Sequence, residues 1–170
     1  MRYTGIMKVV LIAVDIRSAH NIGSLFRTCD GFGAELLLVG VCPRPLGSDD
    51  DTRLPHIARK ANKAIAKTAL GAEQTVPWRH VDTLLEAKTI LKKEGYRLIA
   101  IEQAKHSSSL RTLEPQDNIA LVVGREVEGL DGVELKLCDE VYEIPMKGSK
   151  ESFNVSVAAG IALYQVAGVN

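Results

Sequence analysis

Short, almost continuously apolar segments recur along the chain, and each is followed by a stretch of helical periodicity. The clearest segments are residues 8–14 (KVVLIAV), 35–41 (ELLLVGV) and 118–123 (NIALVV). Strands that are apolar on both faces suit the interior of a parallel sheet, because helices cover such a sheet on both sides. The alternation therefore predicts an α/β sandwich with a mostly parallel sheet.

The remaining segments complete this pattern. Further strands are expected at 97–102 and 140–144, and a weaker one at 74–78, where Pro77 suits a sheet edge or a strand end. Helical patterns cover residues 22–32, 54–70, 81–94 and 155–166, with a short turn near 131–137. A chain of 170 residues without a linker or repeat fits one domain. We expect a single domain over 1–170 with no appended RNA-binding domain.

The composition excludes several classes of protein. With 46% hydrophobic and 25% charged residues, the chain is expected to fold rather than to be disordered. Cys29, Cys42 and Cys138 are odd in number and form no CxxC pair, which indicates reduced thiols, a cytoplasmic location and no structural zinc. No apolar run approaches ~18 residues, so the sequence predicts neither a membrane span nor export.

Charge is unevenly distributed along a chain whose net charge is zero. Residues 17–67 carry eight Lys/Arg and five Asp/Glu, whereas residues 71–143 carry nine and fourteen. Within the first region, basic residues fall at helical spacing at His56, Arg59, Lys60, Lys63 and Lys67. This basic stripe could track RNA phosphates, but a solvated lysine face is the interpretation that the sequence favours.

Polar residues crowd the turn after the first strand, in the segment 15–28. Open α/β sheets bind ligands at this edge. Asn21 is a suitable N-cap for the next helix. Gly23 and Arg27 lie one turn apart and away from the apolar stripe, so the glycine could leave the arginine room for a planar anion such as phosphate. An ordinary surface arginine on a capped amphipathic helix is the alternative.

In two later segments, polar loop residues stand directly beside an expected buried strand or helix. Residues 124–130 (GREVEGL) follow a strand and form either a ligand loop or a glycine-bounded turn with a solvated acidic pair. In residues 144–160, Ser152 and Asn154 stand between a Gly/Ser/Lys loop and an apolar helix. So much polarity beside so much apolar surface indicates a ligand site.

Together the three segments resemble the motifs of the SpoU group of SPOUT RNA methyltransferases. The pattern N-x-G-x-x-x-R-T is met by residues 21–28, G-x-E-x-x-G-L by 124–130, and I-P-M with S-F-N-V-S by 144–156. Phe153 replaces the usual leucine, which is a conservative change. The resemblance spans 15–160 and implies a SPOUT fold with a C-terminal trefoil knot, and a homodimer. The apolar helix 155–166 suits either a dimer interface or simple burial.

The resemblance also implies an activity. Its methyl donor is S-adenosylmethionine, and its acceptor is the ribose 2′-hydroxyl of RNA. It assigns catalytic roles to Arg27, Asn21, Glu126, Ser152 and Asn154. It assigns the donor pocket to Gly124, Glu126, Gly129, Leu130, Ile144, Met146, Ser152, Phe153 and Asn154.

Arg27 is a poor general base, because a guanidinium has a pKa above ~12. We therefore expect Arg27 to clamp a phosphate and to stabilise the developing alkoxide, with Glu126 as the partner that orients it.

Other functions are excluded or left open. The chain lacks G-x-x-x-x-G-K-[ST], and Gly31-Phe32-Gly33 is followed by Leu36 where G-x-G-x-x-G requires glycine. A non-catalytic RNA-binding protein of the same knotted fold and a base-directed methyltransferase remain as alternatives. Because no extra RNA-binding domain is expected, transfer RNA, a small folded target, is favoured over ribosomal RNA. The histidines and cysteines show no metal-ligand spacing.

Overall fold

One parallel sheet organises the molecule. The computed structural model describes residues 7–47, 51–115 and 118–167. In this part of the chain the sheet has seven strands in the order β3-β2-β1-β6-β4-β7-β5, and every pair is parallel. The strands are β1 (Val9–Val14), β2 (Glu35–Val39), β3 (Trp78–Val81), β4 (Tyr96–Ile101), β5 (Ser108–Ser109), β6 (Asn118–Val123) and β7 (Glu140–Glu143). The predicted α/β class is confirmed.

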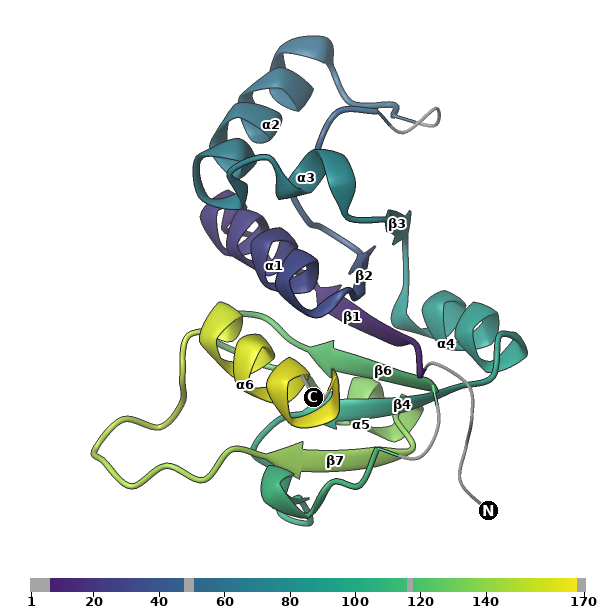
Figure 1. Ribbon diagram of the computed structural model, residues 1–170, viewed down its shortest axis with the longest axis vertical. Coiled ribbons are helices and arrows are strands. Elements are labelled where there is room, and N and C mark those ends of the chain that lie inside the picture. The colour runs from purple at the N-terminus through teal and green to yellow at the C-terminus, as the bar shows by residue number, and fades with distance from the viewer. Residues whose placement is uncertain (1–6, 48–50, 116–117, 168–170) are drawn as a thin grey trace.

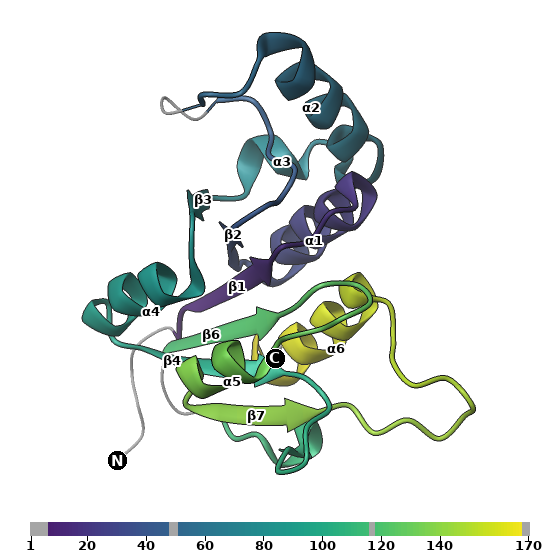
Figure 2. The same cartoon turned by 180° about the vertical axis from the view of Figure 1, so that it is seen from behind.

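Helices cover both faces of this sheet (Figures 1 and 2). Side chains of α1, α2 and α6 share one core cluster, and side chains of α4 and α5 pack in the other. The helices are α1 (Ala19–Phe32), α2 (Pro55–Ala69), α3 (Ala72–Thr75), α4 (Leu84–Lys93), α5 (Gly132–Leu137) and α6 (Val155–Ala167), with a 3₁₀ turn η1 (Leu110–Thr112). Two covered faces explain why the central strands are apolar throughout.

Strand β1 shows this arrangement residue by residue. Leu11 and Ala13 point to the cluster that contains α1 and α6, whereas Val10 and Ile12 point to the cluster under α4. All four side chains are fully buried. Because successive side chains of a strand alternate between faces, both sets had to be apolar.

The predicted strand at 74–78 is wrong. Residues Ala72–Thr75 form the short helix α3, and the strand begins only at Trp78. Pro77 lies between them, and its carbonyl accepts a hydrogen bond from Leu36 N (3.0 Å). Ala, Glu and Gln favour a helix, and the residue before a proline is pushed to an extended conformation, so the strand starts after the proline.

Other boundaries also differ from the prediction. Strand β2 ends at Val39, because Gly40 takes a left-handed φ of 70°. Helix α4 begins at Leu84, where Thr83 caps it, while Val81 still belongs to β3. A turn at residues 104–107 follows β4 and leads into the two-residue edge strand β5.

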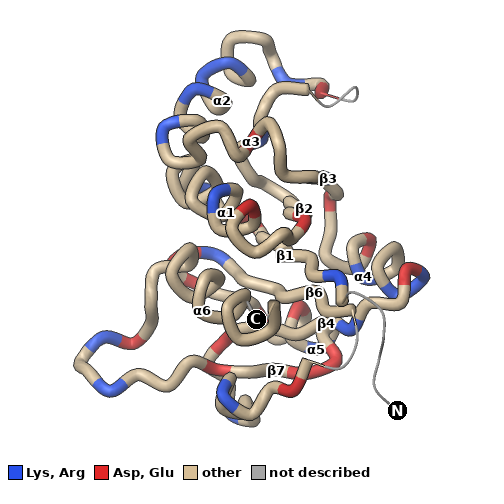
Figure 3. Tube along the Cα trace, viewed as in Figure 1, with Lys and Arg blue, Asp and Glu red and all other residues tan. Residues whose placement is uncertain are grey.

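Threading of the C-terminal segment through a loop stays a prediction. In the described residues no helix is long and apolar enough to cross a membrane. Figure 3 shows lysine and arginine along α2 and several acidic residues around β7, with further basic residues in the loop after β7 and on α4.

Candidate active site

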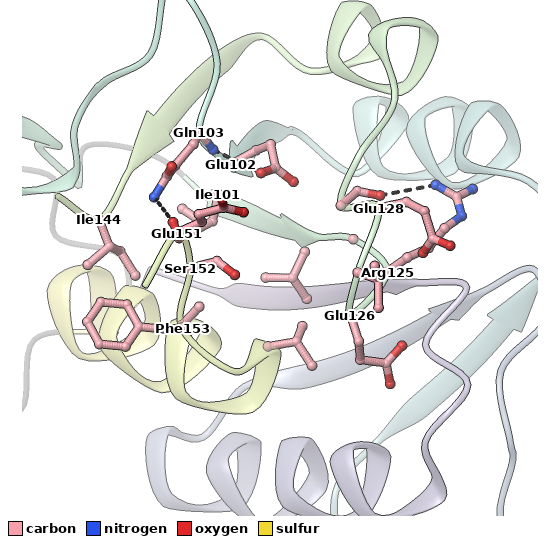
Figure 4. A pocket seen from close by; sticks show the side chains of 16 residues that line it. Ile101, Glu102, Gln103, Arg125, Glu126, Glu128, Ile144, Glu151, Ser152 and Phe153 are labelled. Carbon is pink, nitrogen blue, oxygen red and sulfur yellow. Dashed lines mark hydrogen bonds between the residues drawn. The ribbon is translucent and has the colours of Figure 1, made fainter. Parts of the chain in front are cut away.

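A cavity of about 220 Å³ opens at the carboxyl ends of β4 and β6 (Figure 4). This is the edge at which open α/β sheets bind ligands. Its walls come from the ends of both strands, the loop 124–129, Ile144 after β7, and the residues around the start of α6. The lining residues are Ile101, Glu102, Gln103, Val123, Gly124, Arg125, Glu126, Val127, Glu128, Gly129, Ile144, Glu151, Ser152, Phe153, Val155 and Ala158.

Two glycines allow the loop after β6 to fold tightly on itself. A Cβ on Gly124 would lie 2.6 Å from Leu130 N, so no side chain fits there. Gly129 has a left-handed φ of 67°, and its backbone N–H donates to the carbonyl of Arg125 (3.1 Å). At these two positions the absence of a side chain therefore lets the loop backbone pack closely at this wall of the cavity.

The Arg125 side chain fastens this loop to its surroundings. Its guanidinium donates to both carboxylate oxygens of Glu134 (2.8 and 2.9 Å), to Asp15 Oδ2 (2.6 Å) and to the carbonyl of Gly129 (3.2 Å). The hydrogen bonds to Glu134, followed by those to Asp15, raise the pKa of Arg125 above its ordinary value against the effect of burial. Asp15 in turn accepts from Val41 N (2.7 Å) and has a left-handed φ of 50°.

Glu102 holds the same loop from β4. One carboxylate oxygen accepts from Leu130 N (2.9 Å) and the other from Gln103 N (2.9 Å). A Cβ on Gly129 would collide with this carboxylate, which explains the glycine. Gln103 Nε2 donates to the carbonyl of Glu151 (2.6 Å) across the cavity mouth.

Sequence reasoning missed Glu102, Gln103 and Arg125. The position of Glu102 and Gln103 at the end of a predicted strand could have indicated them, because the carboxyl ends of parallel strands meet at one edge of the sheet.

The three sequence motifs meet in one hydrogen-bonded chain beside the cavity. Asn21 Nδ2 donates to Glu126 Oε1 (3.0 Å), and Asn154 Nδ2 donates to Asn21 Oδ1 (3.3 Å). Glu126 also accepts from the backbone N–H groups of Ser18 (3.0 Å) and Arg17 (3.4 Å). Partial burial raises the pKa of Glu126, but the bonds from Asn21 and Ser18 outweigh it and place the pKa below the usual value.

The predicted N-cap of α1 is corrected. Ser18 caps the helix, and its hydroxyl accepts from Asn21 N (3.2 Å). Asn21 lies inside the first turn, so its side-chain amide is free to reach Glu126. This links the start of α1 to the loop after β6.

The interpretation of Gly23 is also corrected. Gly23 is buried, and a Cβ there would collide with Thr68 Oγ1 and the carbonyl of Ile65 on α2. The glycine therefore allows α1 and α2 to pack closely, and it does not make room for an anion at Arg27.

Arg27 lies on the exposed side of α1. Within the described ranges, no side chain forms a hydrogen bond or ion pair with its guanidinium. Glu126, the partner expected from the sequence, is bonded to Asn21 and to the backbone before α1 instead. The guanidinium is thus available to an external anion.

Most of the predicted donor residues line the cavity, namely Gly124, Glu126, Gly129, Ile144, Ser152 and Phe153. Leu130, Met146 and Asn154 are outside the lining. Leu130 is buried in the core below α4, and only its backbone N–H reaches Glu102. Asn154 precedes α6, where its Oδ1 accepts from Ser156 N (2.9 Å).

The cysteine thiols play no visible part in the site. Burial raises the pKa of Cys29 to about 12 and that of Cys42 to about 11, so both thiols stay protonated at neutral pH. Over the ranges that the structure describes, no group of three or more His, Cys, Asp or Glu side chains could hold a metal ion.

The family model described as the SpoU rRNA Methylase family matches residues 8–164. The chain belongs to this family. It is 34% identical over 157 residues to the 23S rRNA (guanosine-2′-O-)-methyltransferase RlmB of Burkholderia sp., covering 92% of this chain and 58% of that protein. It is 32% identical over 160 residues to RlmB of Pectobacterium atrosepticum, covering 94% and 59%. The SpoU chain thus spans somewhat over half of these curated relatives.

Solved structures share its fold. The A. aeolicus TrmH/SpoU tRNA modifying enzyme matches with a TM-score of 0.74 and 25% identity, over 94% of the SpoU chain and 74% of that protein. The AdoMet-bound rRNA methyltransferase from Sinorhizobium meliloti matches with a TM-score of 0.77 and 20% identity, over 96% and 57%. The parallel α/β architecture is therefore that of solved SpoU proteins.

Proposed function

We propose that this SpoU chain transfers a methyl group from S-adenosylmethionine to a ribose 2′-hydroxyl of RNA. The observation that carries the proposal is the hydrogen-bonded chain Asn154–Asn21–Glu126. It joins one residue from each of three distant motifs at the rim of a single cavity. Residues that cluster on a surface by chance would not be expected to come one from each of these three motifs.

The charge and the apolar walls of the cavity suit the proposed donor. Four carboxylates line it, from Glu102, Glu126, Glu128 and Glu151, and its one lining arginine, Arg125, is paired with Asp15 and Glu134. A negative environment favours a cationic sulfonium. Apolar walls from Ile101, Val123, Ile144 and Phe153 offer surface for a nucleoside.

When bound, the donor supplies an electrophilic methyl group on sulfur. The chain's own residues then have positioning roles. Gly124 and Gly129 allow the loop after β6 to fold tightly at the cavity wall, and Glu126 fixes that loop against α1. Ser152, exposed at the cavity, has its hydroxyl available for a ribose or donor group. Alignment of reacting groups contributes up to roughly 7–11 kcal/mol in such reactions.

Arg27 is assigned to the RNA side of the reaction. Its exposed guanidinium has no protein partner in the described part of the chain, and it is a strong ligand for phosphate. We assign it to holding a phosphate near the target ribose and stabilising the developing alkoxide. A role as proton acceptor is disfavoured by its high pKa.

Ribosomal RNA is the favoured substrate class. The names of the two curated relatives specify a guanosine of 23S rRNA, which reverses the preference for transfer RNA that the sequence suggested. Transfer RNA is the second candidate, because the A. aeolicus relative is named as a tRNA modifying enzyme.

Helix α6 supports a homodimer. Val155, Ala159, Ala162, Leu163 and Val166 are buried in the core, as one of the two interpretations predicted. The opposite side exposes Val157, Ile161 and Tyr164 at helical spacing. We propose that a second copy covers this apolar face. Sedimentation equilibrium should give twice the chain mass, and Ile161→Glu should shift it toward the monomer.

Transfer of labelled methyl groups tests the proposed reaction. Purified protein is incubated with methyl-labelled S-adenosylmethionine and with either ribosomal or transfer RNA from cells that lack the protein. Label in one RNA, at a nucleotide whose 3′ linkage resists alkaline hydrolysis, supports 2′-O transfer. Label in a base would favour the base-directed alternative, and RNA binding without any label would favour a non-catalytic protein.

A further inference from the structure

Helix α2 has one strongly basic face. The exposed side chains of His56, Arg59, Lys60, Lys63 and Lys67 form this basic stripe. The opposite side, with Ala58, Ile65 and Ala69, is buried against the rest of the molecule. The helix contains no Asp or Glu, so nothing on α2 itself offsets the charge.

The stripe is also uncompensated by neighbouring elements. Within the described ranges none of its five side chains forms an ion pair or a side-chain hydrogen bond. Elsewhere in the described residues, four arginines form ion pairs with carboxylates, namely Arg53 with Asp51, Arg79 with Glu35, Arg97 with Glu140 and Arg125 with Glu134. Figure 3 shows basic residues along α2 and no acidic residue on it. An ordinary solvated face usually mixes both signs.

The stripe begins next to the candidate active site. Thr68 Oγ1, at the end of α2, donates to the carbonyl of His20 (2.8 Å), and the next residue, Asn21, belongs to the motif chain. Gly23 lets the two helices pack closely at this end. Lys67 therefore lies near the start of α1, and His56 lies eleven residues farther along α2, about 17 Å away at 1.5 Å per residue.

We propose that the basic stripe on α2 binds the phosphodiester backbone of the RNA substrate beside the target nucleotide. This rests on the proposed methyl transfer. A linear polyanion matches a linear row of cations. A chain of zero net charge has no general attraction for RNA, so affinity must come from a local surface. Arg27 binds the phosphate nearest the reaction, and α2 guides the strand away from it.

The test compares two doubly substituted proteins with equal loss of charge. The variant Lys63→Gln/Lys67→Gln removes two cations from the stripe. The control Lys88→Gln/Lys93→Gln removes two from α4, which lies on the opposite face of the sheet. Each is measured for RNA affinity between 50 and 400 mM salt, for donor affinity, and for kcat and KM in methyl transfer. An unchanged melting temperature confirms that each variant is folded.

We expect the α2 variant to reduce the slope of log affinity against log salt by about 1.4–1.8, because each phosphate contact contributes about 0.7–0.9. The KM for RNA should rise about 10- to 50-fold at 0.1 M salt, with kcat at saturating RNA and donor affinity unchanged. The α4 control should match the unmodified protein.

If the enzyme is active and the α2 variant keeps the salt slope of the unmodified protein, the role of α2 is refuted and the proposed function is not. Equal changes in the two variants would also overturn it, because they indicate unspecific charge. If the unmodified protein transfers no methyl group but its RNA binding still depends on the basic stripe, the proposed function is refuted. The role of α2 in RNA binding is then still supported.

Discussion

Asn21 on α1 and Glu126 after β6 are 105 residues apart in sequence and joined by a 3.0 Å hydrogen bond. The same carboxylate accepts from the backbone of Ser18 (3.0 Å), so the loop at the cavity is fastened to the start of α1. Asn154 extends the connection to the segment before α6. Changes at Glu126 should therefore disturb the cavity wall and the helix start together.

Glu126→Gln should destabilise the protein in a pH-dependent way. Hydrogen bonds lower the pKa of Glu126 in the folded state. The stabilisation from its carboxylate is therefore fully present above its unfolded pKa of about 4.3 and is lost as the pH falls through the lower folded pKa. Because the group is only partly buried, we expect a loss of about 1–2 kcal/mol at pH 7.

Urea unfolding at several pH values from 3 to 7 measures this effect. The difference in unfolding free energy between the unmodified protein and Glu126→Gln should be constant near pH 7 and shrink below about pH 4. A difference that is the same at pH 3 and pH 7 would show that the charge of Glu126 is irrelevant to stability.

Gly23→Ala should weaken the packing of α1 on α2. The added methyl group would collide with Thr68 and with the backbone carbonyl of Ile65, and backbone cannot move aside as a side chain can. Overpacking of this kind costs about 1–3 kcal/mol. The loss should appear as a lower midpoint in urea unfolding.

Gly31→Ala is the matched control on the same helix. A Cβ there meets no atom within 4 Å, and alanine is favoured over glycine in helices by about 1 kcal/mol. This variant should therefore be as stable as the unmodified protein or slightly more stable. Equal destabilisation by the two substitutions would refute the close-packing role of Gly23.

The fold was predictable where one physical requirement determined the pattern. The residues of β1 and β6 must be apolar on both faces, so their positions follow from the sequence alone. The strand β3 was misplaced because it is short and only partly buried, so it has no such pattern. The helix α3 before it depends on local propensity and on Pro77.

Only the residues of the site that lie in the three motifs could be predicted from the sequence. Glu126 and Ser152, which lie in the motifs, line the cavity. The role of Glu102 depends on Leu130, 28 residues away, and that of Arg125 on Asp15, 110 residues away. A single sequence contains no information on such pairings. Gly23 was misinterpreted for the same reason, because the helix that it contacts lies more than 40 residues away.

Arg27→Ala should strongly reduce methyl transfer and leave donor binding nearly unchanged. The guanidinium is exposed and makes no ion pair within the described ranges, so its loss should not disturb the fold. Loss of a preorganised charge at the reacting oxygen costs about 10²–10³ in kcat. Isothermal titration with S-adenosylmethionine and single-turnover transfer to RNA separate the two effects.

Arg17→Ala provides the comparison for this result. Arg17 is also an exposed arginine near the start of α1, and only its backbone N–H contacts Glu126. Its removal should lower kcat by less than about threefold, because its side chain has no assigned role. If Arg27→Ala retains full kcat, or if both variants lose activity equally, Arg27 has no specific catalytic role.

Arg125→Gln should loosen the loop 124–129, to which we assign donor binding, and leave the basic stripe on α2 unchanged. The substitution removes bonds to Glu134, Asp15 and the carbonyl of Gly129, and it leaves two carboxylates without their cation. We expect donor affinity to fall about tenfold, equivalent to about 1.4 kcal/mol, and amide exchange at Gly129 and Leu130 to accelerate. The salt dependence of RNA binding should not change.

Arg79→Gln is the control for this substitution. It breaks ion pairs to Glu35 and Glu94 away from the cavity, so it should lower stability and leave donor affinity unchanged. Equal donor affinity in Arg125→Gln and the unmodified protein would show that the loop keeps its shape without this arginine.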